Sequence, residues 1–135
     1  MSNTVVALDV GEKRIGVAQG DTVVRIAIPY ETVDVDGDEL TTIARIILDS
    51  HASTVVVGYP RNQSGEVTAQ TAFVEAFVDR LNALESDAEI IYQDESLTSV
   101  LAEQRLIAQK WPYSKADIDM HAASIILEDY LERRG

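Results

Sequence analysis

Apolar and polar positions along the chain follow two different periods, which predict strands and helices in alternation. Short apolar runs bounded by turn residues predict five strands. We expect these strands at Val5–Leu8, Ile15–Ala18, Thr22–Ile28 (ended by Pro29), Ser53–Gly58 and Asp87–Tyr92. Polar residues rich in Gly, Pro, Asn and Asp predict loops at Glu31–Asp38 and Tyr59–Glu66.

Apolar residues at helical spacing predict four helices. The first runs from Asp38 to about His51, and the third from Ser99 to about Gln109 behind a Thr98 cap. The last runs from Lys115 to near Arg133. The second buries one side, with Val67, Thr71, Val74, Phe77, Val78, Leu81 and Leu84. The order βββαβαβαα predicts an α/β layer fold, with the later strands parallel to the first.

Length and composition narrow the class of protein. The 135 residues, 46% of them hydrophobic, suit one globular domain spanning 1–135. We expect no membrane span and no secretory signal, because no apolar run approaches ~20 residues and no basic region precedes one. The absence of cysteine excludes disulfides, thiol nucleophiles and thiolate metal sites. A cytoplasmic protein fits these features.

The formal net charge of −12 opposes non-specific binding to nucleic acid, whose phosphates repel an acidic surface. A nucleic-acid substrate therefore needs a local basic patch or bound cations. Lys13, Arg14, Arg61, Arg105, Lys110 and Lys115 could form such a rim. A solvated scatter is the alternative, and an exposed salt bridge is favoured for Arg105.

A carboxylate follows the first strand, at Asp9. An ionised carboxylate at the end of an apolar strand is costly to bury unless something pairs with it. Gly11 then marks a turn, and Lys13 and Arg14 follow. A metal, a phosphate, or a salt bridge to Lys13 or Arg14 would each account for Asp9.

A second pair of acids, Asp94 and Glu95, ends the fifth strand. Carboxyl ends of parallel strands meet at one edge of a sheet, so one of these acids should approach Asp9. Side chains alternate along a strand, so only one can point to the same face. The strand pattern does not choose between them.

The last helix carries two acids with different environments. Asp117 forms an S-x-x-D capping box with Ser114, which gives it a structural role on a polar face with His121, Ser124 and Glu128. Asp119 instead heads an apolar stripe, made of Ala122, Ala123, Ile126 and Tyr130. A carboxylate there needs compensation, either at the sheet edge beside Asp9 or by a buried salt bridge with an arginine.

Three acids brought together without cysteine ligands suit a hard cation such as Mg²⁺ or Mn²⁺, which prefers oxygen donors. Two such ions can activate a water and stabilise the leaving oxygen of a phosphodiester. They would also supply positive charge that the composition lacks.

Four blocks of the sequence resemble the YqgF family of RNase H-like nucleases, also called the RuvX family. The blocks are ALDVGEKRIGVAQGD, VVVGYPRNQSGE, DESLTSVLAEQRL and KADIDMHAASIILEDYLERR. The resemblance implies a three-layer RNase H-like fold, with a five-stranded mixed sheet in the order 3-2-1-4-5 between helices. It also implies a metal-dependent endonuclease acting on structured nucleic acid. The roles ascribed to the family are 5′-end trimming of precursor 16S rRNA and resolution of Holliday junctions.

The resemblance assigns the acidic, metal-binding site to Asp9, Glu95 and Asp119, and so selects Glu95 over Asp94. Lys13, Arg14 and Asn62 match family loop positions near the substrate. Ser96 departs from the pattern, because many relatives have arginine there. The segment before the last helix, commonly basic in relatives, offers Lys110 and Lys115.

Two other functions stay open at this point. The ATP-binding sugar-kinase and actin superfamily shares the hairpin and sheet order, although this chain is short for its two-domain clamp. A non-catalytic module could use the same edge to dock RNA or a basic protein.

A homodimer would suit symmetric cleavage of a junction.

Overall fold

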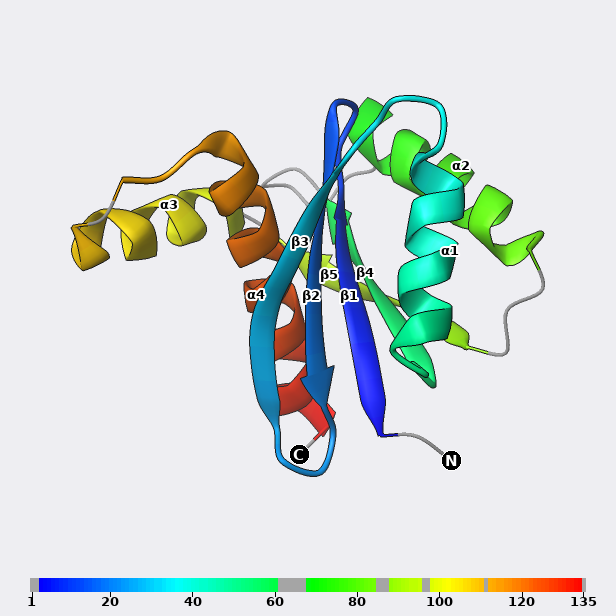
Figure 1. The fold of residues 1–135 in the computed structure, drawn as a ribbon, viewed down its shortest axis with the longest axis horizontal. Coiled ribbons are helices and arrows are strands. Elements are labelled where there is room, and N and C mark those ends of the chain that lie inside the picture. The colour runs from blue at the N-terminus through cyan, green and yellow to red at the C-terminus, as the bar shows by residue number, and fades with distance from the viewer. Residues whose placement is uncertain (1–2, 61–67, 85–87, 96–97, 111, 135) are drawn as a thin grey trace.

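The computed structural model describes residues 3–60, 68–84, 88–95, 98–110 and 112–134. The elements follow the predicted order (Figure 1). They are β1 (Thr4–Val10), β2 (Arg14–Asp21), β3 (Ile26–Asp34), α1 (Glu39–Asp49), β4 (Thr54–Pro60), α2 (Ala69–Asn82), β5 (Glu89–Glu95), α3 (Thr98–Gln109) and α4 (Lys115–Arg134).

The five strands form one mixed sheet in the order β3-β2-β1-β4-β5, which confirms the expected topology. β1, β2 and β3 form an antiparallel meander, whereas β4 and β5 run parallel to β1. The carboxyl ends of β1, β4 and β5 therefore meet at one edge of the sheet. We call this the carboxyl edge.

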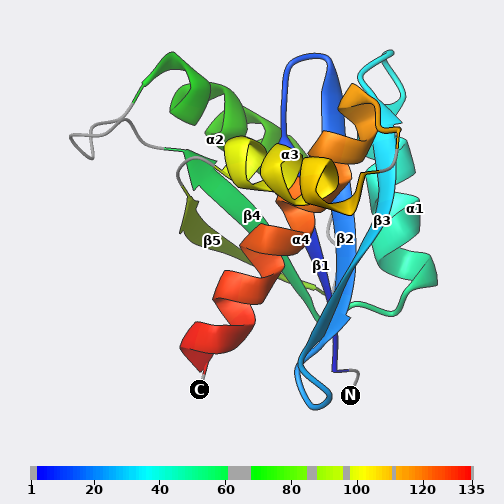
Figure 2. The ribbon, with the colours of Figure 1, turned by 90° about the vertical axis from the view of Figure 1, so that its left-hand side faces the viewer.

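Helices cover both faces of the sheet (Figures 1 and 2). α1 and α2 pack on one face through a cluster that includes Ile43, Phe77 and Leu81. α4 packs on the other face through Ile126 and Leu127. α3 lies on the outer side of α4 rather than on the sheet, and the two helices share a small apolar cluster.

The prediction for the third strand was wrong in its bounds, because residues 22–25 form a turn instead of a strand. The Asp21 carboxylate accepts hydrogen bonds from the backbone N–H groups of Val23 and Val24, at 2.7 and 2.9 Å. Arg25 has a φ of 62°, in the left-handed region. A side chain that caps its own turn competes with strand pairing.

β3 then continues through Pro29 to Asp34, where a loop was predicted. Proline disrupts a central strand, but β3 is an edge strand and pairs only with β2 in this sheet. The pairing shifts register between Val17 and Ala18, and Pro29 lies opposite Ala18. The bulge accommodates the proline, so the strand persists.

α4 approaches the sheet closely along its first turns. The hydroxyl of Thr32 on β3 donates a hydrogen bond to the carbonyl of Ala116, at 2.6 Å. The sheet-facing stripe includes Ala123, Ile126 and Tyr130 as predicted. Ala122 instead packs toward α3.

Ser124 was predicted on the polar face of α4 but is buried. Its hydroxyl donates to the carbonyl of His121, at 2.8 Å, which satisfies the buried oxygen. None of the described helices is both long and apolar enough to cross a membrane.

Candidate active site

Asp9 lies on the face of the sheet that α4 covers. Val5 and Ala7, which share its alternating set on β1, pack in the cluster with α4, whereas Val6 and Leu8 pack toward α1 and α2. Asp9 is partly exposed and stands opposite Gly16 on β2. The first strand therefore ends with a carboxylate under the start of α4.

Gly16 brings Asp119 to the same place. A Cβ atom at Gly16 would collide with the carbonyl group of Asp119 and lie 3.0 Å from the amide nitrogen of Met120. The backbone of α4 thus touches β2 at the residue that pairs with Asp9. Glycine inside a strand often marks the close approach of another backbone. The position of Gly16 inside a predicted strand was therefore a signal for this contact, and the sequence analysis did not use it.

The Asp119 carboxylate forms a salt bridge with Arg14. The Arg14 Nε donates to Asp119 Oδ2 at 2.6 Å, and the two side chains are 30% and 21% exposed. Two forms of compensation were expected for Asp119, an acidic site at the edge or an arginine partner. The structure shows the arginine partner. The backbone of the same residue lies against Gly16, which pairs with Asp9.

Asp117 has the structural role predicted for it. Its Oδ2 accepts from the Ser114 backbone N–H at 2.9 Å, and Ser114 Oγ accepts from the Asp117 N–H at 3.3 Å. This reciprocal capping box fixes the start of α4.

The register of β5 separates Asp94 from the α4 face. Ile90 packs in the cluster with α1 and α2, so Asp94 belongs to the set that faces those helices. Ile91, on the other face of β5, packs against the cluster of α4. The side chain of Glu95 lies outside the described residues.

The start of α2 is fixed to the carboxyl edge by two side-chain hydrogen bonds. Gln70 Nε2 donates to the carbonyl of Val10 at 3.0 Å, and Thr71 Oγ1 donates to the carbonyl of Pro60 at 2.6 Å. The N–H groups at the N-terminus of a helix favour anions, and at this helix the Thr71 N–H is already bonded to Thr68 Oγ1. The predicted nucleic-acid contacts Arg61 and Asn62 follow Pro60 but lie outside the described residues.

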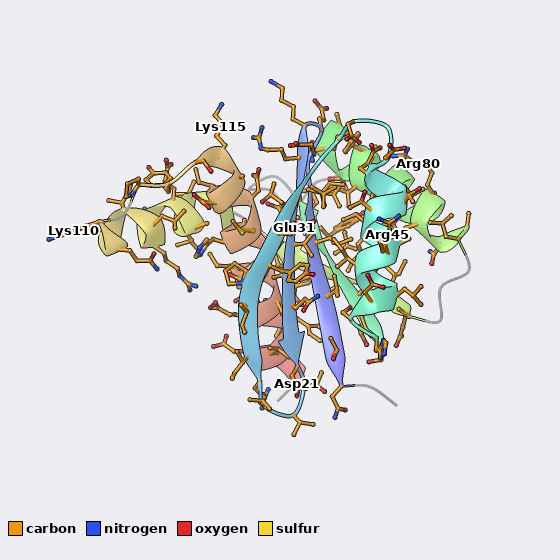
Figure 3. All side chains as sticks on the ribbon, in the orientation of Figure 1. Asp21, Glu31, Arg45, Arg80, Lys110 and Lys115 are labelled. Atoms are coloured by element: carbon orange, nitrogen blue, oxygen red, sulfur yellow. The ribbon has the colours of Figure 1, made fainter. Side chains whose placement is uncertain are left out.

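The predicted basic residues that lie within the described ranges are not gathered into one patch. Lys13 is exposed in the β1–β2 turn, and Lys115 begins α4 at the same end of the molecule (Figure 3). Lys110 stands at the outer tip of α3, away from Lys115. The structure therefore brings Lys13 and Lys115 to the end that carries Asp9 and leaves Lys110 apart.

Polar contacts join α3 to α4 and to the segment that precedes α4. Arg105 Nη1 contacts Glu128 at 2.9 Å with both side chains about half exposed, which confirms the exposed salt bridge. The Tyr113 hydroxyl donates to Glu103 at 2.8 Å. These contacts hold α3 against α4 at the surface.

The donor chemistry of the site fits a hard divalent cation, although the described residues alone do not complete it. Asp9 and Asp119 supply carboxylate oxygens on one face, and cysteine is absent from the chain. No group of three acidic or histidine side chains able to hold a metal occurs among the described residues. A complete set would need the carboxylate of Glu95.

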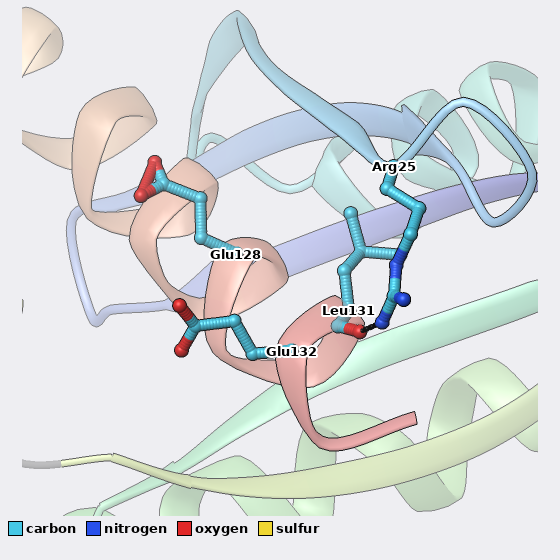
Figure 4. A pocket seen from close by; sticks show the side chains of 4 residues that line it. All are labelled: Arg25, Glu128, Leu131 and Glu132. Atoms are coloured by element: carbon cyan, nitrogen blue, oxygen red, sulfur yellow. Dashed lines mark hydrogen bonds between the residues drawn. The ribbon is translucent and has the colours of Figure 1, made fainter. Parts of the chain in front are cut away.

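Two pockets among the described residues lie at the opposite end of the strands. One, of about 410 Å³, is lined by Arg25, Glu128, Leu131 and Glu132 (Figure 4). Its arginine donates to the Leu131 carbonyl near the end of α4. The other, of about 340 Å³, lies between the start of β1 and the β2–β3 turn. Neither adjoins Asp9, and a phosphodiester backbone does not need a deep pocket.

We expect Asp129→Asn to stabilise the protein at neutral pH. Burial raises the pKa of the Asp129 carboxyl, and the neighbouring Glu132 raises it further. An acid whose pKa is raised by folding destabilises the fold once ionised. The cost is absent below the unfolded pKa, grows as the pH rises from the unfolded to the folded pKa, and is fully present above the folded pKa.

Thermal melts of the variant should show a higher Tm than the wild type at pH 7 and no difference at about pH 3, below the usual aspartate pKa. Glu31→Gln removes one negative charge from an exposed position on β3 and controls for global repulsion. An equal gain in both variants would contradict a cost specific to Asp129.

Comparison with known proteins identifies the family of this chain. Residues 3–133 match the model of the family described as "RuvX: Holliday junction resolvase". A protein of Chloroflexus aggregans named "Putative pre-16S rRNA nuclease" is 45% identical over 135 residues, covering 97% of this chain and 94% of that protein.

Two solved resolvase structures share the fold. Thermus thermophilus RuvC in complex with a Holliday junction has a TM-score of 0.59 at 13% identity, covering 97% of this chain and 94% of that one. The fowlpox virus resolvase with its junction DNA has a TM-score of 0.61 at 14% identity, covering 97% and 98%. Identities this low establish the fold alone.

The sheet order, the helices on both faces and the resolvase neighbours define the fold as RNase H-like. The chain belongs to the RuvX family, whose relatives are named as nucleases. The predictions of fold and family are thereby confirmed.

Proposed function

We propose that this protein is a metal-dependent endonuclease that hydrolyses phosphodiester bonds in structured nucleic acid, with 5′-end processing of precursor 16S rRNA as its role. The main support is the meeting of Asp9 and Asp119 at Gly16, on one face of the carboxyl edge. Relatives named for precursor 16S rRNA cleavage cover nearly the whole chain. Such a role would place the protein in the bacterial cytoplasm.

Asp9, Glu95 and Asp119 would hold Mg²⁺ or Mn²⁺, with two ions as the proposed number. When bound, such ions supply an activated water and stabilise the leaving oxygen. The chain itself contributes the positioning of the carboxylates: β1 fixes Asp9, and the contact at Gly16 fixes Asp119. Lys13, Lys115, Arg14, Arg61, Asn62 and Lys110 are the proposed contacts to nucleic acid.

Cleavage of a Holliday junction is the second candidate. The family description and the neighbour structures with junction DNA favour it. A junction resolvase needs two active sites on opposed strands, and a homodimer would provide them. The two candidates share the metal chemistry and differ in substrate.

The test is cleavage of labelled precursor 16S rRNA and of a four-way DNA junction side by side, with Mn²⁺ and with EDTA. We expect cleavage of the rRNA near its 5′ end that EDTA abolishes. Cleavage of the junction alone would transfer the proposal to a resolvase. Binding of either substrate with no cleavage under Mg²⁺ or Mn²⁺ would favour a docking module instead.

A further inference from the structure

The salt bridge between Arg14 and Asp119 joins two residues that the proposed nuclease would use in different ways. Asp119 would bind the cation, and Arg14 would contact nucleic acid. In the structure the two bind each other, with Nε to Oδ2 at 2.6 Å. Each side chain is only partly exposed. The backbones of both residues lie close to Asp9, because Arg14 begins β2 two residues before Gly16, and Gly16 pairs with Asp9 and touches the Asp119 backbone.

One carboxylate oxygen cannot bind the Arg14 guanidinium and a metal cation at the same time without losing affinity for one of them. The Arg14 guanidinium and a metal cation are both positive. Like charges within a few ångströms repel strongly where water is partly excluded. A cation that binds Oδ2 must therefore displace Arg14, or bind through other oxygens at lower affinity. The observed pair is a competitor for the site.

The position of Arg14 determines where its side chain can go once released. It begins β2, directly after the exposed turn residue Lys13. Its side chain is 30% exposed in the pair, so it can turn outward without breaking the apolar core. An arginine released at this edge presents a planar set of donors that matches phosphate.

We propose that Arg14 is a positioning residue that exchanges partners: it holds Asp119 in the metal-free protein and yields that carboxylate to the divalent cation. The released guanidinium then faces the phosphate backbone of the nucleic acid. This inference rests on the proposed function, because it takes Asp119 as a ligand. It adds that metal binding and exposure of Arg14 are coupled, and such coupling is reciprocal.

The experiment is calorimetric titration of the whole protein with Mn²⁺ alone, in the absence of nucleic acid. We expect Arg14→Gln to bind Mn²⁺ about fivefold more tightly than the wild type, because the competing partner of Asp119 is gone. Arg14→Lys retains a cation that can pair with Asp119 and should stay nearer the wild-type affinity.

Arg105→Gln is the matched control. It removes the same charge and another arginine–carboxylate bridge, to Glu128 on the surface between α3 and α4. We expect its Mn²⁺ affinity to stay within about twofold of the wild type, since screening weakens distant charges. An effect as large as that of Arg14→Gln would mean that net charge alone sets the affinity, and would overturn the proposal.

Thermal melts give a second readout. Without metal, Arg14→Gln should melt below the wild type, because Asp119 loses its partner, and saturating Mn²⁺ should raise its Tm more than it raises that of the wild type. Equal or weaker Mn²⁺ binding by Arg14→Gln would overturn the exchange. Failure of the proposed function is seen separately, as no Mn²⁺ binding by the wild type or undiminished binding by Asp9→Asn.

Discussion

Asp9→Asn is expected to reduce metal-dependent cleavage at least a hundredfold while the fold survives. Changes to groups that merely orient metal ligands cost about 10- to 100-fold, so loss of a ligand should cost no less. The amide has nearly the shape of the carboxylate, and Asp9 is only partly buried. Removing a negative charge from a chain of net charge −12 does not add repulsion.

Initial cleavage rates with saturating Mn²⁺, and thermal melts of the same preparations, measure the two effects separately. Asp94→Asn is the matched control, because Asp94 lies at the same carboxyl edge but on the α1 and α2 face. It should cleave at close to the wild-type rate. Cleavage by Asp9→Asn within about threefold of the wild type, or an equal loss in Asp94→Asn, would contradict the proposed site.

Much of this site could be predicted because it depends on local patterns. The apolar run before Asp9 indicates a strand end, and the capping box with Ser114 accounts for Asp117. The apolar stripe of the last helix distinguishes Asp119 from Asp117 without any tertiary information. The order of elements then places the carboxyl ends of β1, β4 and β5 together.

Other features depend on contacts between distant residues, and the sequence left them open. A choice between Asp94 and Glu95 requires knowing which face of β5 meets α4, and that follows from the packing of Ile90 and Ile91. The sequence also did not determine whether a metal site or an arginine compensates the charge of Asp119. The pattern suggested Lys13 or Arg14 as a local partner for Asp9, yet Arg14 reaches across to α4.

The third strand shows how tertiary position overrides a local signal. Pro29 is a strong signal for the end of a strand, and it led to the wrong bounds for β3. An edge strand tolerates proline, but the edge position of β3 is a property of the whole sheet. The turn before β3 depends on the Asp21 carboxylate, which accepts hydrogen bonds from two backbone N–H groups. Neither fact follows from hydrophobic spacing.

Gly16→Ala is expected to destabilise the protein by about 3 kcal/mol and to lower the Tm by about 10 °C. The added Cβ would meet the carbonyl group of Asp119 and the amide nitrogen of Met120, and both are backbone atoms that cannot rotate away. α4 would have to move off β2 at its first turns. That movement would also strain the Thr32 hydrogen bond to Ala116.

Gly37→Ala separates this collision from the loss of a glycine as such. Gly37 has a φ of 105° but no atom within 4 Å of the added Cβ, so its cost is backbone strain alone, about 1 kcal/mol. Melts of the two variants should therefore differ by several degrees. A Gly16→Ala protein as stable as the wild type would mean that α4 does not touch β2 at this residue.

The same contact links stability to the site, because the Asp119 backbone packs on Gly16, the strand residue opposite Asp9. Gly16→Ala should therefore weaken Mn²⁺ binding under conditions in which the variant is still fully folded, while Gly37→Ala should not. Loss of stability with unchanged Mn²⁺ affinity would show that Asp119 takes no part in the metal site.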